Sequence, residues 1–190
     1  MSDFEFVFVL YSLVLGLSLV ELLSGFGKAL ERKLASEDGG AGFRMGWLTP
    51  LLGLFVILDL LSFWSFAWTL QNQVTVSTRM LLAVIAFASA YFMAARLVFP
   101  GEPGAFADLD RHYFRVHRIV FAILIALVFV QWAYLWTIQQ IRAALVSPLS
   151  VGLTVTLIVL MMLAAWLRSR KWSAVVLVAL IIRYTVVYLR

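Results

Sequence analysis

Six long runs of apolar residues alternate with short polar segments along this chain. The runs cover about residues 4–26, 46–70, 80–99, 119–138, 148–167 and 172–189. Because an α-helix rises about 1.5 Å per residue, roughly 20 apolar residues cross the hydrocarbon core of a bilayer. The segments between the runs are rich in charge, glycine or amide groups, which suit chain reversals in water. The pattern predicts an all-α, polytopic membrane helix bundle with six transmembrane helices, forming a single domain over residues 1–190.

Composition supports lipid rather than water as the solvent. Of the 190 residues, 64% are hydrophobic and only 13% are charged, more apolar surface than a soluble domain of this size can bury. The chain has no cysteine, which excludes disulfides and cysteine-ligated metals. Its start, MSDFEFVFVL, lacks the basic segment of a secretory signal peptide, so we expect the first run to remain as a membrane helix.

The positive charges are distributed unevenly between the connecting segments. The second and fourth segments carry one each, Arg79 and Arg142. All other connecting segments are richer in positive charge; their basic residues are Lys28, Arg32, Lys33, Arg44, Arg96, Arg111, Arg115, Arg118, Arg168, Arg170 and Lys171. Since cytoplasmic loops retain Lys and Arg, the first, third and fifth segments are predicted to face the cytoplasm and both termini to face outward. The net charge of +5 is then a record of topology, and we expect no nucleic-acid partner.

Tryptophans mark the predicted outer boundary. The segments WSFAWTLQ (64–71) and WAYLWTIQ (132–139) match in order, at the outward ends of the second and fourth runs. Indole rings settle at the headgroup level, so an aromatic belt accounts for the tryptophans. A parallel duplication of a helical hairpin accounts for the match as well. The sequence leaves both interpretations open.

Asp59 is the strongest indication of a functional site, because it lies in the middle of the second apolar run. A carboxylate at this depth costs at least about 2.5–3.5 kcal/mol to insert, so it must be protonated, paired or facing a polar cavity. Projected on a helix, Ser62, Ser65 and Thr69 form a polar stripe from Asp59 to the outer surface. We predict that this stripe faces the interior of the bundle; hydroxyls that bond only to their own helix are the structural alternative.

Two further ionisable residues lie well inside the runs. Arg183 lies at a depth similar to that of Asp59, so we predict that the two form an intramembrane pair. The alternative is that the long side chain of Arg183 reaches the outer interface. Glu21 is shallower and is a further candidate for this ion, proton or substrate site; Lys28, about two turns further on the same helix face, either neutralises it or lies in water.

The third connecting segment predicts a contact with lipid headgroups. Asp108 is expected to cap a short amphipathic helix that turns Phe106, Leu109, Tyr113 and Val116 toward the membrane. Arg111, Arg115 and Arg118 would then meet anionic headgroups of the inner leaflet. His112 and His117 are the only histidines, and their spacing does not make their side chains converge, so we expect no metal site.

Small residues recur in the third run, where Ala86, Ala90 and Ala94 are four residues apart. This spacing lets helices approach closely, so the third helix should pack centrally or line an oligomer contact. We expect a homo-oligomer, most simply a dimer, with the lipid bilayer as its surroundings.

The segments LYSLVLGLSLVELLSGFGKALERK, LDLLSFWSFAW, LVFPGE and DLDRHYFRVHRIVF resemble those of small bacterial inner-membrane proteins that have no assigned activity. The resemblance implies a bacterial inner (plasma) membrane and supplies no mechanism.

Two functional hypotheses follow. The first is a small channel or transporter that moves protons, ions or a small solute past Asp59 and Arg183. The second is an accessory or sensor protein that does not transport, and that binds a membrane-protein partner or lipid through its basic cytoplasmic loops. Phosphate-binding loops, nucleophile elbows and H-E-x-x-H motifs are absent from the sequence, so we expect no enzymatic activity and no cofactor.

Overall fold

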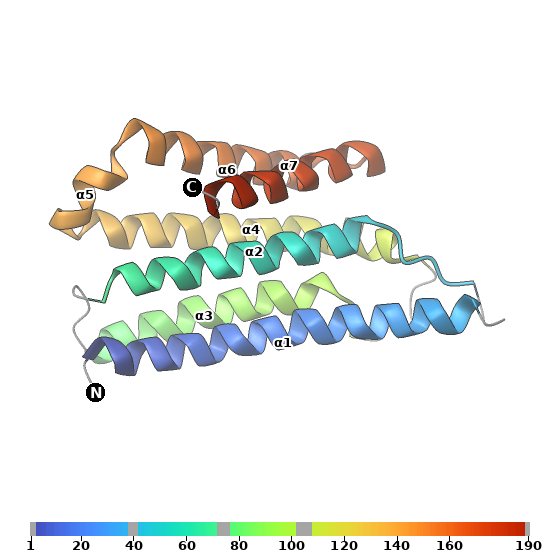
Figure 1. Cartoon of the computed structure of the whole chain (residues 1–190), viewed down its shortest axis with the longest axis horizontal. Coiled ribbons are helices and arrows are strands. Elements are labelled where there is room, and N and C mark those ends of the chain that lie inside the picture. Colours follow the sequence, from blue (N-terminus) through green and yellow to red (C-terminus); the bar gives the residue numbers. More distant parts are fainter. Residues whose placement is uncertain (1–2, 38–41, 72–76, 102–107, 189–190) are drawn as a thin grey trace.

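The computed structural model of the chain describes residues 3–37, 42–71, 77–101 and 108–188. Within these residues it contains seven α-helices (Figure 1). They are α1 (Asp3–Glu37), α2 (Leu48–Thr69), α3 (Thr78–Val98), α4 (Leu109–Trp136), α5 (Gln139–Leu145), α6 (Pro148–Trp166) and α7 (Arg170–Tyr188). All except α5 are long and apolar enough to cross a membrane. The predicted all-helical architecture with six candidate spans is therefore confirmed.

The helix boundaries differ from the apolar runs at three places. Helix α1 continues past the first run to Glu37, and the acidic, glycine-rich tip that follows lies at 38–41, outside the described residues. Helix α4 begins already at Leu109. The short helix α5 was not predicted, because it lies in the polar segment after the fourth run. Side-chain caps set the starts of α3 and α6: Ser77 accepts a hydrogen bond from Met80 N at 3.2 Å and Ser147 accepts one from Ser150 N at 3.3 Å.

The long helices lie side by side along one axis (Figure 1). Helix α1 packs against α2 and α3, α3 against α4, and α2 against α7, while α6 packs against α4 and α7. Helix α1 begins at the end of the bundle where α5 lies, and α7 runs back toward this end (Figure 1). An even number of spans produces this arrangement. We call this the α5 end.

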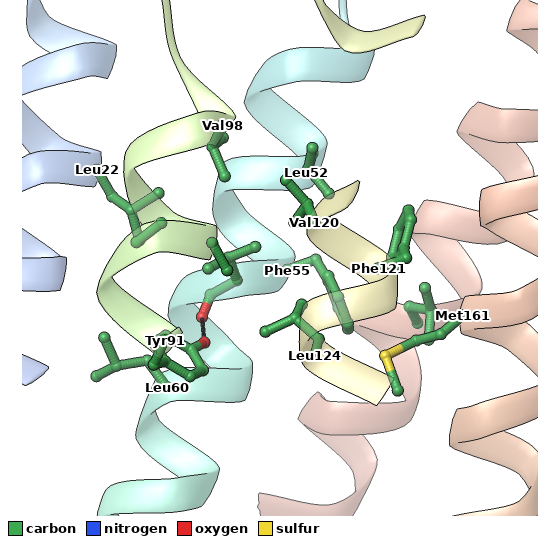
Figure 2. Packing of buried hydrophobic residues seen from close by; sticks show 14 of the residues in the cluster. Leu22, Leu52, Phe55, Leu60, Tyr91, Val98, Val120, Phe121, Leu124 and Met161 are labelled. Atoms are coloured by element: carbon green, nitrogen blue, oxygen red, sulfur yellow. Dashed lines mark hydrogen bonds between the residues drawn. The ribbon is translucent and has the colours of Figure 1, made fainter. Parts of the chain in front are cut away.

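Large apolar side chains fill the centre of the bundle. Figure 2 shows Leu52 and Phe55 of α2 meeting Phe121 and Leu124 of α4, and all four are fully buried. The outer surfaces are apolar too. On α1 alone the exposed residues include Phe6, Val9, Leu13, Leu17, Val20 and Leu23. Water would not tolerate so large a continuous apolar surface, whereas lipid covers it without cost.

The prediction of a separate interfacial helix before the fourth span is wrong. Leu109, Tyr113 and Val116 are buried inside the bundle, and the first turns of α4 continue directly into the span. The apolar periodicity was correct, but its face packs against protein instead of lipid. Arg111, Arg115 and Arg118 are exposed on the other side of the helix. Their contact with lipid headgroups stays a prediction; Phe106 lies outside the described residues.

The alanines of α3 pack in part within the chain. Ala94 is fully buried and Ala90 is half-buried, whereas Ala86 is exposed. Ala88 and Ala95, on neighbouring faces, are also buried. Close packing of α3 is therefore confirmed, and the homodimer stays a prediction.

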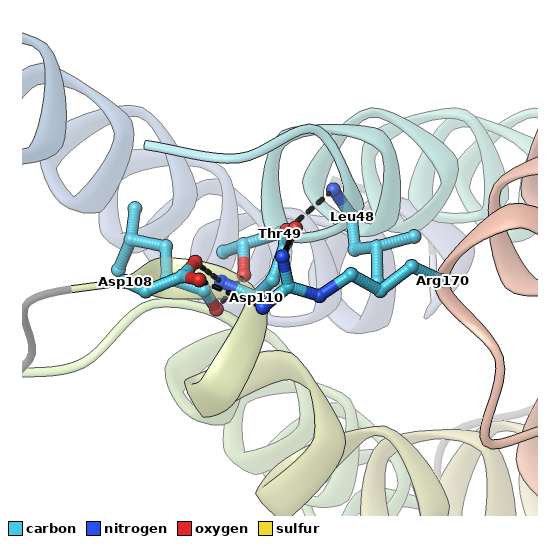
Figure 3. Close-up of polar contacts among 6 residues, drawn as sticks. Leu48, Thr49, Asp108, Asp110 and Arg170 are labelled. Atoms are coloured by element: carbon cyan, nitrogen blue, oxygen red, sulfur yellow. Dashed lines mark hydrogen bonds and ion pairs between the residues drawn. The ribbon is translucent and has the colours of Figure 1, made fainter. Parts of the chain in front are cut away.

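Residues from three helices form a polar cluster at the end of the bundle opposite α5, which we call the clasp (Figure 3). It comprises Leu48 and Thr49 of α2, Asp108 and Asp110 at the start of α4, and Arg170 of α7. Asp110 Oδ1 accepts a hydrogen bond from Leu48 N at 3.1 Å, and Thr49 Oγ1 donates to Leu109 O at 2.9 Å. Because Trp47 gives α2 no side-chain cap, Asp110 caps α2 from another helix.

Asp108 extends the clasp to α7. Its Oδ1 accepts a hydrogen bond from Asp110 N at 2.9 Å, which caps α4 as predicted, and its Oδ2 lies 2.8 Å from Arg170 Nη2. At Gly46, which has a φ of 62°, the backbone lies close to the Asp110 carboxylate. A Cβ there would overlap the Asp110 carboxylate, so glycine is required for both reasons.

We expect Asp110→Ala to destabilise the bundle by about 1–2 kcal/mol, the cost of losing a helix cap. Tryptophan fluorescence during thermal unfolding of the purified protein measures the effect. Glu31→Ala, which removes an exposed carboxylate near the end of α1, is the matched control. Equal melting temperatures for the two variants would show that the Asp110 cap contributes nothing.

Candidate functional site

The Asp59 carboxylate joins three helices at the middle of the bundle. Asp59 is 1% exposed, and its Oδ1 accepts a hydrogen bond from Tyr184 Oη of α7 at 2.5 Å. Its Oδ2 lies 3.2 Å from Tyr91 Oη of α3. Both carboxylate oxygens therefore have a phenol partner, which is how a buried polar group avoids a large desolvation cost.

The Tyr91 hydroxyl has one hydrogen and two neighbouring acceptors. Its Oη also lies 2.7 Å from Val56 O of α2, a shorter contact than the one to Asp59 (Figure 2 shows Tyr91 reaching toward α2). An ionised Asp59 and Val56 must compete for this hydrogen. A protonated Asp59 removes the competition, because the acid then donates to Tyr91 Oη while Tyr91 donates to Val56 O. The hydrogen-bond pattern thus responds to the proton on Asp59.

Arg183 does not pair directly with Asp59, so the predicted ion pair is wrong in its detail. Its Nε and Nη2 donate to Leu153 O of α6 at 3.3 and 3.0 Å, and its guanidinium lies over the Tyr184 ring at 4.9 Å. Among the described residues, the ion pairs within 4.0 Å do not include one between Asp59 and Arg183. The physical reason is that a helix carbonyl has a spare lone pair, and α6 brings that carbonyl closer than the carboxylate.

Asp59 and Arg183 nevertheless line the same cavity, which has a volume of about 190 Å³. It is enclosed by α2, α4, α6 and α7 together with Leu145 of α5, and α1 does not contribute to it. It extends from Asp59 toward the α5 end of the bundle. Its other polar side chains are Ser62, Gln131, Ser150, Thr154 and the Tyr184 hydroxyl group. We call it the polar cavity.

The predicted polar stripe on α2 is correct only at Ser62. Ser65 and Thr69 are exposed on the outside of the helix, and Thr69 Oγ1 donates to Phe66 O at 2.7 Å. Each step of three residues falls about 60° short of a full turn, so Ser65 lies about 120° away from Asp59 around the helix. The structural alternative, a hydroxyl bonded to its own helix, therefore holds for Thr69.

Glu21 belongs to a separate pair. Its Oε1 lies 2.5 Å from Arg96 Nη1 of α3, and the two side chains are partly exposed. Neither residue lines the polar cavity. Of the two alternatives for Lys28, the structure favours the one in which it lies in water, because Lys28 is exposed and Glu21 pairs with Arg96. The pair joins α1 to α3 and gives Glu21 a structural role.

Sequence reasoning missed five polar residues of the site: Tyr91, Tyr184, Gln131, Ser150 and Thr154. Gln131 carried a usable signal, because an amide interrupts the apolar sequence VFVQWAY. Ser150 and Thr154 are four residues apart and share a helix face. The two tyrosines carried no signal, since aromatic residues are common in membrane helices.

A second cavity, of about 170 Å³, lies next to the polar cavity. It is enclosed by α1, α2, α3 and α4, and its lining is almost entirely apolar; Phe4, Val7, Phe8, Met80, Ala83 and Val84 contribute. Phe63, Phe66 and Gln131 line both cavities and so form a common wall. We call it the apolar cavity.

The described residues contain no group of three or more His, Asp or Glu side chains that could hold a metal ion. His112 Nε2 lies 3.1 Å from Leu97 O, and His117 Nδ1 lies 3.1 Å from Tyr113 O. His112 is therefore engaged with the backbone of α3 and His117 with that of α4. Comparisons with known protein families, curated proteins and solved structures found no match to this chain.

Proposed function

We propose that this chain is a small transporter of a bacterial inner membrane, moving protons, ions or a small solute past Asp59 and Arg183. The observation that supports it is the polar cavity, which brings a buried carboxylate and a guanidinium together inside six candidate membrane helices. Ionisable groups are expensive in this position, and they typically mark substrate or ion pathways in membrane proteins.

The proposed orientation places the clasp in the cytoplasm and both chain ends outside. Exposed arginines gather at the clasp end, where α4 carries Arg111, Arg115 and Arg118 and α7 begins with Arg170. At the α5 end, Arg142 donates two hydrogen bonds to Trp136 O. This distribution agrees with the positive-inside rule. The polar cavity then lies on the outward side of Asp59.

A carrier fits the geometry better than an open pore. Beyond Asp59, toward the clasp, the way is filled by Leu52, Phe55, Phe121 and Leu124, which are fully buried. A solute that reaches Asp59 from the outside must wait for the helices to rearrange before it can leave. In the proposed cycle Asp59 accepts and releases a proton or meets a cation, Tyr91 and Tyr184 hold its carboxylate, and Arg183 supplies the counter-charge.

Flux into liposomes tests the proposal, with two serines as a matched pair. Ser62 lines the polar cavity and Ser65, one turn on, is exposed on the same helix. We expect Ser62→Ala to slow the flux of protons or of the transported solute by about two- to tenfold, the value of one hydrogen bond. Ser65→Ala should leave it unchanged. Equal effects of the two substitutions would remove the cavity from the pathway.

A non-transporting accessory or sensor protein is the second candidate. The exposed row of Arg111, Arg115 and Arg118 favours it, because such a row suits anionic headgroups or an acidic partner. Absence of flux under every proton, ion or solute gradient, together with loss of bound anionic lipid when the three arginines are replaced by glutamine, would favour this function.

A further inference from the structure

We propose that the polar and apolar cavities are two halves of one binding site for a single-chain amphiphile with a small anionic headgroup. The headgroup lies beside Arg183 and the start of the chain lies between α1 and α3. This inference rests on the proposed function, since it names the class of solute that the cavity beside Asp59 takes.

The two cavities share one wall. Phe63, Phe66 and Gln131 line both cavities, so the distance between the two spaces is one layer of side chains. Phe63 is buried, whereas Phe66 and Gln131 are partly exposed, so fewer neighbouring atoms hold these two side chains in place. Rotation of Phe66 joins a polar space to an apolar one. A molecule that occupies both spaces must itself have a polar end and an apolar end.

The lining of the polar cavity favours a negatively charged headgroup. Arg183 lines the polar cavity, and its nitrogens bond to a backbone carbonyl and lie over an aromatic ring without a carboxylate within 4.0 Å. Both Asp59 oxygens are already held by tyrosines. Hydroxyl groups of Ser150 and Thr154 line the same space. A guanidinium with neighbouring hydroxyl donors suits a phosphate or carboxylate, which gains charge-assisted hydrogen bonds there.

The volumes of the two cavities limit the size of the ligand. An apolar protein cavity of about 150 Å³ holds a benzene molecule, so 170 Å³ takes a chain of about six carbons. The polar cavity, at 190 Å³, has similar room for a headgroup and its linkage. Longer chains continue into the surrounding lipid. One acyl or isoprenoid chain fits this space, and a headgroup as large as a sugar chain does not.

The test is equilibrium binding of radiolabelled dodecyl phosphate to the full-length chain in nanodiscs of zwitterionic lipid, with empty nanodiscs as the blank. We expect saturable binding that dodecanoate competes for strongly. Inorganic phosphate, which has no chain, and dodecanol, which has no charge, should compete at least about tenfold less well. Equal competition by inorganic phosphate would reduce the site to a free-anion site, and equal competition by dodecanol would remove the role of Arg183. Either result overturns the proposal.

Two variants and their controls locate the site. Arg183→Gln should weaken dodecyl phosphate binding by about tenfold, whereas Arg142→Gln should not. Ala83 and Ala86 are both exposed on α3, but only Ala83 lines the apolar cavity, so Ala83→Trp adds a ring to the cavity and Ala86→Trp adds the same ring outside it. We expect only Ala83→Trp to weaken binding; if it fails to fold, Met80→Trp fills the same cavity. Wild-type affinity in a folded cavity-filling variant overturns the proposal.

The proposal and the proposed function fail separately. Binding of dodecyl phosphate without flux under any gradient would leave the site and remove the transporter. Flux that depends on Ser62, without binding of dodecyl phosphate, would leave the transporter and remove the amphiphile.

Discussion

Replacement of Asp59 by asparagine is expected to reduce flux to the level of empty liposomes. Asparagine has almost the same shape, and its Oδ1 can accept the hydrogen bond from Tyr184 while its amide nitrogen donates to Tyr91 Oη, but it neither takes up a proton nor holds a negative charge. The hydrogen-bond exchange at Tyr91, which depends on the protonation of Asp59, is then fixed in one arrangement. The measurement is the initial rate of solute or proton uptake under an imposed gradient.

Asp3→Asn is the matched control, because it removes the same charge from the exposed first turn of α1. We expect it to transport like the wild type. Uptake by Asp59→Asn at the wild-type rate, with both proteins reconstituted in equal amounts, would contradict a role for Asp59 in transport.

Thermal stability gives a second readout that a purely structural role of Asp59 would not predict. An ionisable group kept in a buried position costs stability, and its neutral isostere commonly restores some. We therefore expect Asp59→Asn to melt at or above the temperature of the wild type while its flux is lost. A lower melting temperature together with unchanged flux would assign Asp59 to the architecture of the bundle.

The residues of the site that could be predicted from the sequence are those that are expensive to place in a bilayer on their own. Asp59 and Arg183 stand out because the bilayer penalises them wherever their partners are. Their actual partners, Tyr184 and Leu153 O, depend on how α6 and α7 pack against α2. A phenol looks like any aromatic membrane residue, and a backbone carbonyl is present at every position. Neither is recognisable before the helices are placed.

Periodicity predicted the spans but not what their faces contact. The apolar face with Leu109, Tyr113 and Val116 is real, and it is turned toward protein. In a soluble protein an apolar face implies the core. In a membrane protein lipid and protein interiors are equally apolar, so the pattern cannot separate them. The clasp was also missed, because it depends on how the helices pack: Asp110 caps α2 although more than sixty positions of sequence separate it from Leu48.

Gly25→Ala is expected to destabilise the bundle strongly, and Gly16→Ala on the same helix is expected to stabilise it. A Cβ on Gly25 would lie 2.5 Å from Phe99 Cβ and 2.8 Å from its Cγ. Rotation of the ring does not relieve the clash, because Phe99 Cβ is fixed to the backbone, and on its other side the ring packs against Gly53 of α2, where even a Cβ would lie 3.0 Å from Cε2. The resulting overpacking costs about 1–3 kcal/mol and lowers the melting temperature by about 2–10 °C.

Gly16 meets open space, so an alanine there only improves helix propensity, by about 0.5–1 kcal/mol. The same chemical change thus has opposite signs at the two positions, which a general effect of alanine on α1 does not produce. A double-mutant cycle isolates the contact: in a Phe99→Gly background the penalty of Gly25→Ala should disappear, because both the Cβ and the ring that collide with the new methyl group are gone. If the penalty persists there, the close approach of α1 to Phe99 is not its cause, and the packing between α1, α2 and the end of α3 must differ.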